Sequence, residues 1–194
     1  MEIAESVSDL QRLLNILGKL PEPVARPSLI MVGGLPGTGK SYFTGKLAEK
    51  VPVIILASDV LRKVLFPEPV YSGDESFRLF QAIHRLIEHL LKKGNSVIFD
   101  ATNLTEANRE YLYNIAGRLN AKLIIVWVTA PPEIVRQRLE VRRYGAPGSS
   151  DAGWEVYEKL KNTVQNISRS HYVVDTSKDI GLALKKIEHE VLTA

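Results

Sequence analysis

The chain has 194 residues and a formal net charge of +3 at pH 7, with 45% hydrophobic and 24% charged residues. This length and balance predict one globular domain with a buried core. The chain contains no cysteine, which excludes disulfides, thiolate zinc sites and a cysteine nucleophile. The mild positive charge suits an anionic ligand without by itself indicating a nucleic-acid-binding protein.

The start of the chain, MEIAESVSDL, is acidic and lacks the basic and apolar regions of a signal peptide. The longest apolar run, LIIVWV at residues 123–128, is too short to span a bilayer. We therefore expect a cytoplasmic protein with no membrane partner.

The first predicted element is a helix over residues 6–20, where leucines recur at helical spacing. The segment PEPVARP at 21–27 ends that helix, so we expect residues 1–27 to form a helix with a proline-rich linker and 28–194 to form the main domain. Strands and helices then alternate. Strands are predicted at 28–33, 52–57, 96–100, 122–129 and 171–175, and helices at 39–50, 59–66, 75–93, 105–119, 132–143, 153–167 and 179–192. The strands are nearly continuous apolar runs, which predicts an α/β fold with a doubly wound, parallel, five-stranded sheet.

Residues 33–41, GGLPGTGKS, lie between the first strand and the following helix, and fit the phosphate-loop pattern G-x-x-x-x-G-K-[ST]. Glycines let successive N–H groups converge on phosphate oxygens, and the helix N-terminus adds partial positive charge. Lys40 is expected to reach the β- and γ-phosphates of ATP, and the Ser41 hydroxyl to bind Mg²⁺. The other candidate nucleotide contacts are Gly34, Pro36, Gly37, Thr38, Gly39 and Tyr42. A glycine-rich turn without a ligand is the alternative, which the flanking strand and helix disfavour.

Asp59 follows the apolar run VIILAS and stands 19 residues after Lys40 (59 − 40 = 19). Ligands bind beyond the carboxyl ends of strands in parallel sheets, so Asp59 is a candidate general base for an attacking hydroxyl. Arg62, one helical turn later, is a candidate to hold that carboxylate or a substrate anion. In the alternative interpretation Asp59 only caps its helix.

A second strand, SVIF, also runs into an acid, Asp100. Asp100 is a candidate to line the substrate site and to act on Mg²⁺ through water, and its alternative role is to stabilise a turn. Asn103 is a candidate substrate ligand, with turn formation again as the alternative.

Arginines gather in the predicted helix over residues 132–143, and a Gly/Pro/Ser loop at 145–150 follows them. This pattern predicts a helical lid near 132–167 that closes over the γ-phosphate. We expect one or two of the arginines to touch phosphate, with Arg138 as the catalytic candidate and Arg142 as a nucleotide contact. The alternative is a solvated helix face held by ion pairs.

The segments GGLPGTGKS, ASDVLRK, VIFDATNL, APPEIVRQRLEVRR and SDAGWEVYE, in this order, resemble the small P-loop kinases of the AAA_33 or predicted-kinase type. That group is similar to the kinase domain of polynucleotide 5′-hydroxyl kinases. The resemblance spans roughly residues 28–175 and implies a P-loop NTPase fold. It also implies that Lys40 and Ser41 bind phosphate and Mg²⁺, and that Asp59 is the general base of a D-x-x-R element with Arg62 on the substrate side.

Residues and resemblance together favour an ATP-dependent phosphotransferase that acts on a hydroxyl. The acceptor stays open between a polynucleotide 5′ end, a nucleoside and another small molecule. The alternative function is an ATP-binding regulatory switch whose hydrolysis is incidental. A GTPase is disfavoured because the sequence has no N-K-x-D guanine motif.

Overall fold

The computed structural model describes residues 2–143 and 152–194, and the side chains of 9–141 and 152–194. The elements in chain order are α1 Glu2–Asn15, β1 Ser28–Gly33, α2 Lys40–Ala48, β2 Ile54–Ala57, α3 Ser58–Leu65, α4 Gly73–Lys92, β3 Val97–Asp100, α5 Glu106–Arg118, β4 Lys122–Thr129, α6 Pro132–Arg143, α7 Trp154–Lys161, β5 Tyr172–Asp175 and α8 Gly181–Leu192.

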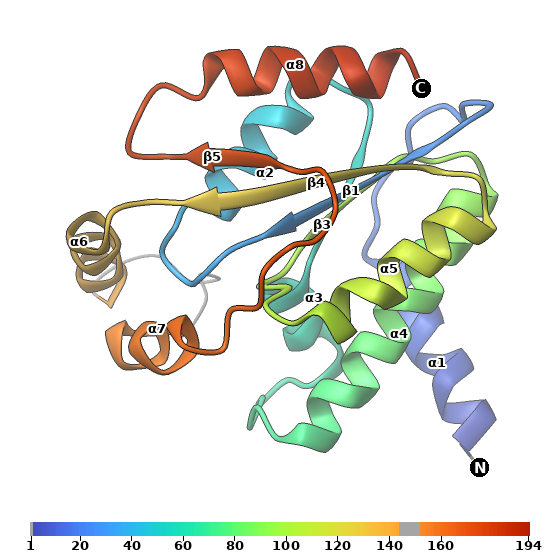
Figure 1. Ribbon diagram of the computed structural model, residues 1–194. Helices are drawn as coiled ribbons and strands as arrows, with labels where there is room; N and C mark the ends of the chain where they lie inside the picture. The colour runs from blue at the N-terminus through green and yellow to red at the C-terminus, as the bar shows by residue number, and fades with distance from the viewer. Residues whose placement is uncertain (1, 144–151) are drawn as a thin grey trace.

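The five strands form one parallel sheet, as the alternation of strands and helices predicts (Figure 1). The strand order in the sheet is β2-β3-β1-β4-β5. The register aligns the ends of three strands, because Asp100 pairs with Val32 of β1 on one side and with Ala57 of β2 on the other. The residues that follow these strands are therefore neighbours in space although they are far apart in sequence.

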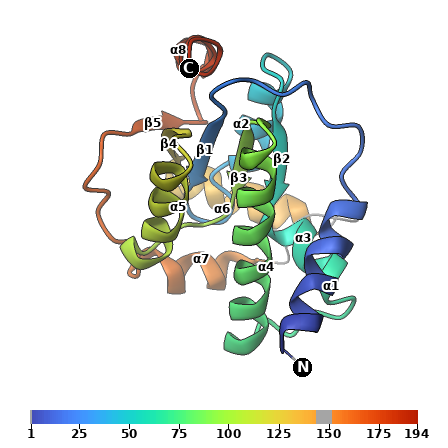
Figure 2. The same cartoon turned by 90° about the vertical axis from the view of Figure 1, so that its right-hand side faces the viewer.

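Helices cover both faces of the sheet, which explains the apolar runs (Figures 1 and 2). Along β1, Leu29 and Met31 join the cluster that includes α1, α3, α4 and α5, while Ile30 and Val32 join the cluster of α2 and α8. All four side chains are fully buried, and each such burial stabilises the fold by about 1.5–3 kcal/mol. The sheet is thus a rigid platform for the loops at its carboxyl edge.

The N-terminal helix lies in the same core as the rest of the domain. Leu13 of α1 is fully buried in the cluster beneath α3 and α4, and Asp9 accepts two hydrogen bonds from Arg78 of α4, at 2.7 and 2.9 Å. The linker is fixed as well, since the Val24 N–H donates to Gly94 O at 2.8 Å. Residues 1–27 are separate from the main domain in sequence pattern, but their described part packs on α3 and α4.

Helix α7 is shorter than the spacing predicts, because it ends at Lys161 and not at residue 167. The backbone N–H of Gln165 instead donates to Leu104 O at 2.9 Å, so this segment is bound to the loop after β3. Ile167 then enters the main hydrophobic cluster. In the part of the chain that the structure describes, no helix has both the length and the apolar character needed to cross a membrane.

Candidate functional site

The phosphate loop leaves β1 at the centre of the sheet and enters α2 at Lys40. Gly34 and Gly39 have φ angles of +144° and +93°, which side-chain-bearing residues rarely adopt. A Cβ on Gly34 would lie 2.3 Å from Val128 O, and one on Gly39 would lie 2.8 Å from Thr176 Oγ1. Gly39 is the N-cap of α2 and has no side chain to accept from the first helical N–H groups, so those groups can bind an anion.

The loop's remaining predicted residues line or support this backbone. Pro36 and Gly37 are buried, and a Cβ on Gly37 would lie 2.8 Å from Val135 Cγ1 of α6. The Thr38 hydroxyl donates to Leu35 O at 2.8 Å. Tyr42 is 55% exposed on α2, and its contact with a nucleotide stays a prediction.

Two predicted metal ligands, Ser41 and Asp100, meet at the carboxyl ends of the strands. The Ser41 hydroxyl donates to Asp100 Oδ2 at 2.9 Å, and the Lys40 ammonium donates to Leu35 O at 3.1 Å. Asp100 is only 5% exposed, and this burial raises the pKa of its carboxyl group. The charge of Lys40 and the bonds from Ser41 and Thr44 oppose that rise, whereas the carboxylate of Asp59 adds to it.

A hydroxyl and a carboxylate are ligands that suit Mg²⁺, which usually takes one or two carboxylates together with phosphates and water. Among the described residues there is no group of three or more His, Asp or Glu side chains that could hold a metal ion. The residues present therefore fit an ion that arrives with the nucleotide.

Asp59 is the second residue of α3, two positions after the last residue of β2. The N-cap of α3 is Ala57, and the capping position makes no side-chain hydrogen bond, so Asp59 does not cap the helix. Because Ala57 pairs with Asp100, the two aspartates occupy neighbouring strand ends. Burial is the main cause of the raised pKa of Asp100, and repulsion from the Asp59 carboxylate adds to it. The role of Asp59 as general base stays a prediction.

Arg62 lies one turn after Asp59, and its guanidinium is already paired. Nη1 forms an ion pair with Glu75 of α4, Nη2 donates to Ser76 Oγ at 3.3 Å, and the Tyr71 ring centroid lies 4.8 Å from the guanidinium carbon. Burial raises the pKa of Glu75, but the hydrogen bonds from Arg62 and from the backbone more than offset it, so the pKa of Glu75 is lowered. The sequence pattern indicates Arg62 and gives no sign of Glu75.

Asn103 shapes the loop that follows β3. Its backbone has a φ of +49°, and its side-chain amide donates to Val32 O at 3.0 Å. The side chain is buried, and the adjacent Thr102 carbonyl accepts from the Gly34 N–H at 3.0 Å. The contacts of Asn103 are thus those of a turn residue that joins two strand ends, and its contact with substrate stays a prediction.

Arg138 connects α6, the first helix of the predicted lid, to the phosphate loop. Its guanidinium donates to Thr176 Oγ1 at 2.7 Å, to Thr176 O at 2.9 Å and to Thr38 O at 3.4 Å. The Thr176 hydroxyl itself donates to Thr38 O at 2.6 Å. Arg136, by contrast, forms an exposed ion pair with Glu140 at 3.0 Å, as the alternative of a solvated helix face would have it. The side chains of Arg142 and Arg143, and the predicted loop at 145–150, lie outside the described residues.

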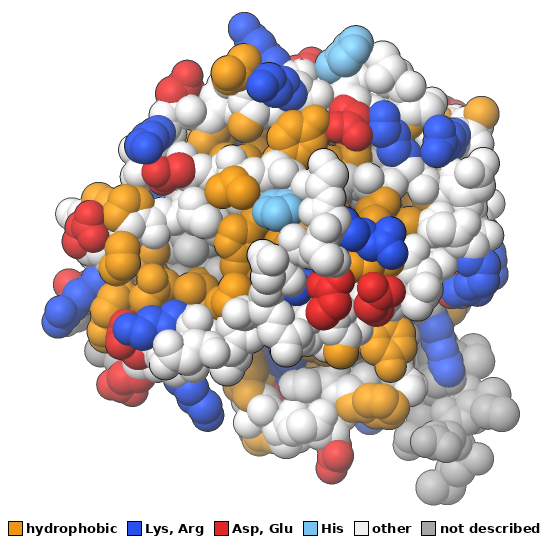
Figure 3. Space-filling view, in the orientation of Figure 1, with side chains coloured by type: hydrophobic (Ala, Val, Ile, Leu, Met, Phe, Trp, Pro, Cys, Tyr) orange, Lys and Arg blue, Asp and Glu red, His pale blue; other side chains and the backbone are white. Residues whose placement is uncertain are grey.

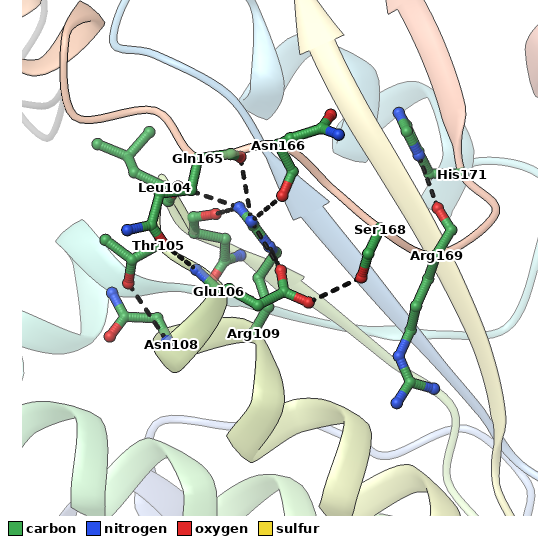
Figure 4. Close-up of polar contacts among 11 residues, drawn as sticks. Leu104, Thr105, Glu106, Asn108, Arg109, Gln165, Asn166, Ser168, Arg169 and His171 are labelled. Carbon is green, nitrogen blue, oxygen red and sulfur yellow. Dashed lines mark hydrogen bonds and ion pairs between the residues drawn. The ribbon is translucent and has the colours of Figure 1, made fainter.

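Arg109 is a fully buried arginine that sequence reasoning missed (Figure 4). Its guanidinium forms an ion pair with Glu106 and donates to four backbone carbonyls, those of Asn103, Leu104, Gln165 and Asn166, at 2.8 to 3.0 Å. The first two carbonyls belong to the loop after β3, and the other two follow α7. Arg109 therefore joins the loop after β3 to the segment that follows α7.

Comparisons with known proteins agree with this geometry. The family model AAA_33, described as an AAA domain, matches residues 29–167. The L-seryl-tRNA(Sec) kinase of Methanococcus maripaludis is 35% identical over 115 residues, which cover 57% of this chain and 44% of that protein. The structure of the Mycobacterium tuberculosis APS kinase CysC in complex with AMPPNP and APS superposes with a TM-score of 0.62 at 17% identity, covering 87% of this chain and 99% of that one.

The structure of the Pnkp1/Rnl/Hen1 RNA repair complex also superposes, with a TM-score of 0.61 at 22% identity over 71% of this chain and 44% of the other. The P-loop NTPase fold is confirmed by these likenesses. The chain spans less than half the length of the curated relatives that it matches.

Proposed function

This chain belongs to the AAA_33 family, and we propose that it is a P-loop kinase that transfers the γ-phosphate of ATP to a hydroxyl group. The observation that carries the proposal is the meeting of three strand ends. There Ser41, the residue after Lys40, donates to Asp100, and Asp59 stands two residues beyond Ala57, the strand-end residue that pairs with Asp100. This arrangement supports a reaction in which a phosphate-binding element and a carboxylate suited to proton removal act together.

In the proposed reaction, the phosphates of ATP lie on the N–H groups at the start of α2 and on Lys40. Asp59 removes the proton from the substrate hydroxyl while the oxygen of that hydroxyl forms a bond to the γ-phosphorus. The bond between the γ-phosphorus and the oxygen that bridges it to the β-phosphate breaks, and ADP leaves. Ser41 and, through water, Asp100 would hold Mg²⁺, which would supply charge neutralisation at the phosphate oxygens. Arg138 holds α6 against the loop, so that lid arginines such as Arg142 can approach the transferred group.

The acceptor is a hydroxyl-bearing molecule. The relatives differ in the substrates that their names state, which are a seryl-tRNA for one kinase and APS for another. Asp59 could deprotonate the hydroxyl of a nucleoside, of another hydroxyl-bearing small molecule or of a nucleic-acid 5′ end. A cytoplasmic location suits a chain that uses ATP and has no cysteine for disulfides.

The proposal is tested by incubating the protein and Mg²⁺ with γ-labelled ATP and a panel of nucleosides, sugars and 5′-hydroxyl oligonucleotides. We expect label to appear in one acceptor class, and Lys40→Ala to lower the rate at least roughly tenfold by loss of a charge-assisted phosphate contact. Lys46→Ala on the same helix is the matched control, since that side chain is 44% exposed and pairs only with Glu49 among the ion pairs found. Tight ATP binding with no labelled acceptor would favour a regulatory switch.

A further inference from the structure

Arg62 lies one helical turn after the proposed general base Asp59, and its charge is already paired. Its Nη1 forms an ion pair with Glu75, and the two side chains are only 8% and 6% exposed. In such a buried pair the two charges cancel at close range, and removing either partner leaves an uncompensated charge. A substrate that approaches Asp59 therefore meets a paired arginine.

Further contacts hold Glu75 in this position. Its Oε2 accepts from the Val70 N–H at 2.8 Å, and its own N–H donates to Ser72 Oγ, the N-cap of α4, at 3.2 Å. The ring of Tyr71 lies over the guanidinium of Arg62, and Tyr71 has a positive φ of 56°. A competing anion would have to displace a carboxylate that is held by Arg62 and by the Val70 N–H, beside the Tyr71 ring that lies over the arginine.

We infer that the acceptor of the proposed kinase presents no phosphate or carboxylate to Arg62, and that Glu75 determines this specificity. The inference rests on the proposed function and names the substrate class of the same site. A nucleoside or a sugar meets the requirement, since each offers a hydroxyl without a neighbouring anion. A polynucleotide 5′ end does not, because its first internucleotide phosphate lies only a few bonds from the attacking oxygen.

One face of the molecule shows how its charged side chains are distributed (Figure 3). On the face shown in Figure 3, the Lys and Arg side chains of the described residues lie scattered among acidic and apolar ones. Proteins that bind nucleic acid usually gather basic side chains into a stripe or groove that follows the phosphates. Exposed apolar side chains stand near Arg62 instead, with Val70 77% and Tyr71 48% exposed.

The first test measures anion binding at Arg62 without catalysis. Inorganic phosphate is titrated into protein saturated with Mg·ADP, which occupies the phosphate loop, and the Arg62 side-chain N–H signal is followed by NMR. We expect phosphate to shift this signal in Glu75→Gln at a concentration roughly tenfold or more below that needed in wild type, because the variant frees the cation. Glu88→Gln, on the same helix but in a surface pair with Arg118, should behave as wild type.

The second test compares a nucleoside with its 3′-phosphate as acceptors in the labelled-ATP assay. Wild type should favour the uncharged nucleoside, and Glu75→Gln should move the preference toward the phosphate by roughly tenfold. Absence of any labelled acceptor would count against the kinase proposal, while the anion titration would still decide the specificity inference. Phosphate binding at Arg62 in wild type as tight as in Glu75→Gln would overturn the inference. If the variant does not fold, displacement of Glu75 from Arg62 by millimolar phosphate in wild type would overturn it.

Discussion

Replacing Arg109 by methionine keeps most of the side-chain volume and removes every hydrogen-bond donor of the buried guanidinium. Four backbone carbonyls and the Glu106 carboxylate then each lose a hydrogen bond, although Leu104 O keeps the Gln165 N–H and Glu106 keeps the Ser168 hydroxyl. Each buried acceptor left unsatisfied costs about 1–3 kcal/mol, and breaking a buried ion pair costs about 3–5 kcal/mol. Since Glu106 is partly exposed and water can reach the segment after α7, we expect a total of about 3–5 kcal/mol.

That loss is a large part of the stability of a domain, which is typically about 5–15 kcal/mol. For a chain of this length, about 1 kcal/mol shifts the melting temperature by roughly 2–4 °C, so Arg109→Met should melt roughly 6–20 °C below wild type. Thermal and urea unfolding followed by circular dichroism measure both quantities. The matched control is Arg118→Met on the same helix, whose side chain is 59% exposed and whose pair with Glu88 should contribute no more than about 1 kcal/mol. A melting temperature for Arg109→Met that equals that of Arg118→Met would refute the reasoning.

Three further outcomes are expected. Gly39→Ala should abolish nucleotide binding measured by titration calorimetry, while the far-ultraviolet circular dichroism spectrum stays native. The reason is that the new Cβ would lie 2.8 Å from Thr176 Oγ1 at a φ of +93°. Native nucleotide affinity would contradict the argument that this position requires a glycine. Arg138→Ala should lower turnover at least roughly tenfold. Arg138→Lys should restore only part of the turnover, because a single ammonium cannot contact both Thr38 and Thr176 as the guanidinium does. Full activity of the alanine variant would remove Arg138 from the mechanism. The folded-state pKa of Glu75 is lowered, so its pair with Arg62 stabilises the fold fully above the unfolded pKa and less as pH falls through the folded pKa. The difference in stability between wild type and Glu75→Gln should therefore narrow as pH falls below the ordinary pKa of a glutamate, and a constant difference in urea unfolding would contradict this.

The fold was predictable because its strands are buried on both faces. An apolar run such as LIIVWV is typical of a strand that helices cover on both faces. The predicted strands match the observed ones within two residues at either end. The errors are at α1, predicted to run to residue 20, and at α7, predicted to run to residue 167. The end of α7 depends on the contact between Gln165 and Leu104, which helical periodicity cannot reveal.

The site also has a part that the sequence predicts and a part that it does not. The phosphate loop is local in sequence, since its glycines, Lys40 and Ser41 stand within a few residues, so a spacing pattern is sufficient to find it. The partners that fix the other side chains are distant: Glu75 lies 13 residues from Arg62, and Thr176 lies 38 residues from Arg138. These pairs form only after α3 and α4, or α6 and β5, have packed on the sheet. Arg109 belongs to this class as well, since in sequence it is one more arginine on a helix.

The rate of phosphate transfer by Asp59→Asn tests the central proposal most directly. Asparagine keeps the size of the side chain and cannot accept the acceptor's proton, and a general base typically contributes about 10²–10⁴ in rate. On the acceptor that wild type labels, we predict a loss in this range with near-native affinity for Mg·ATP, while Asp74→Asn, an exposed acid in the first turn of α4, retains the wild-type rate. Transfer by Asp59→Asn at the wild-type rate would contradict the account.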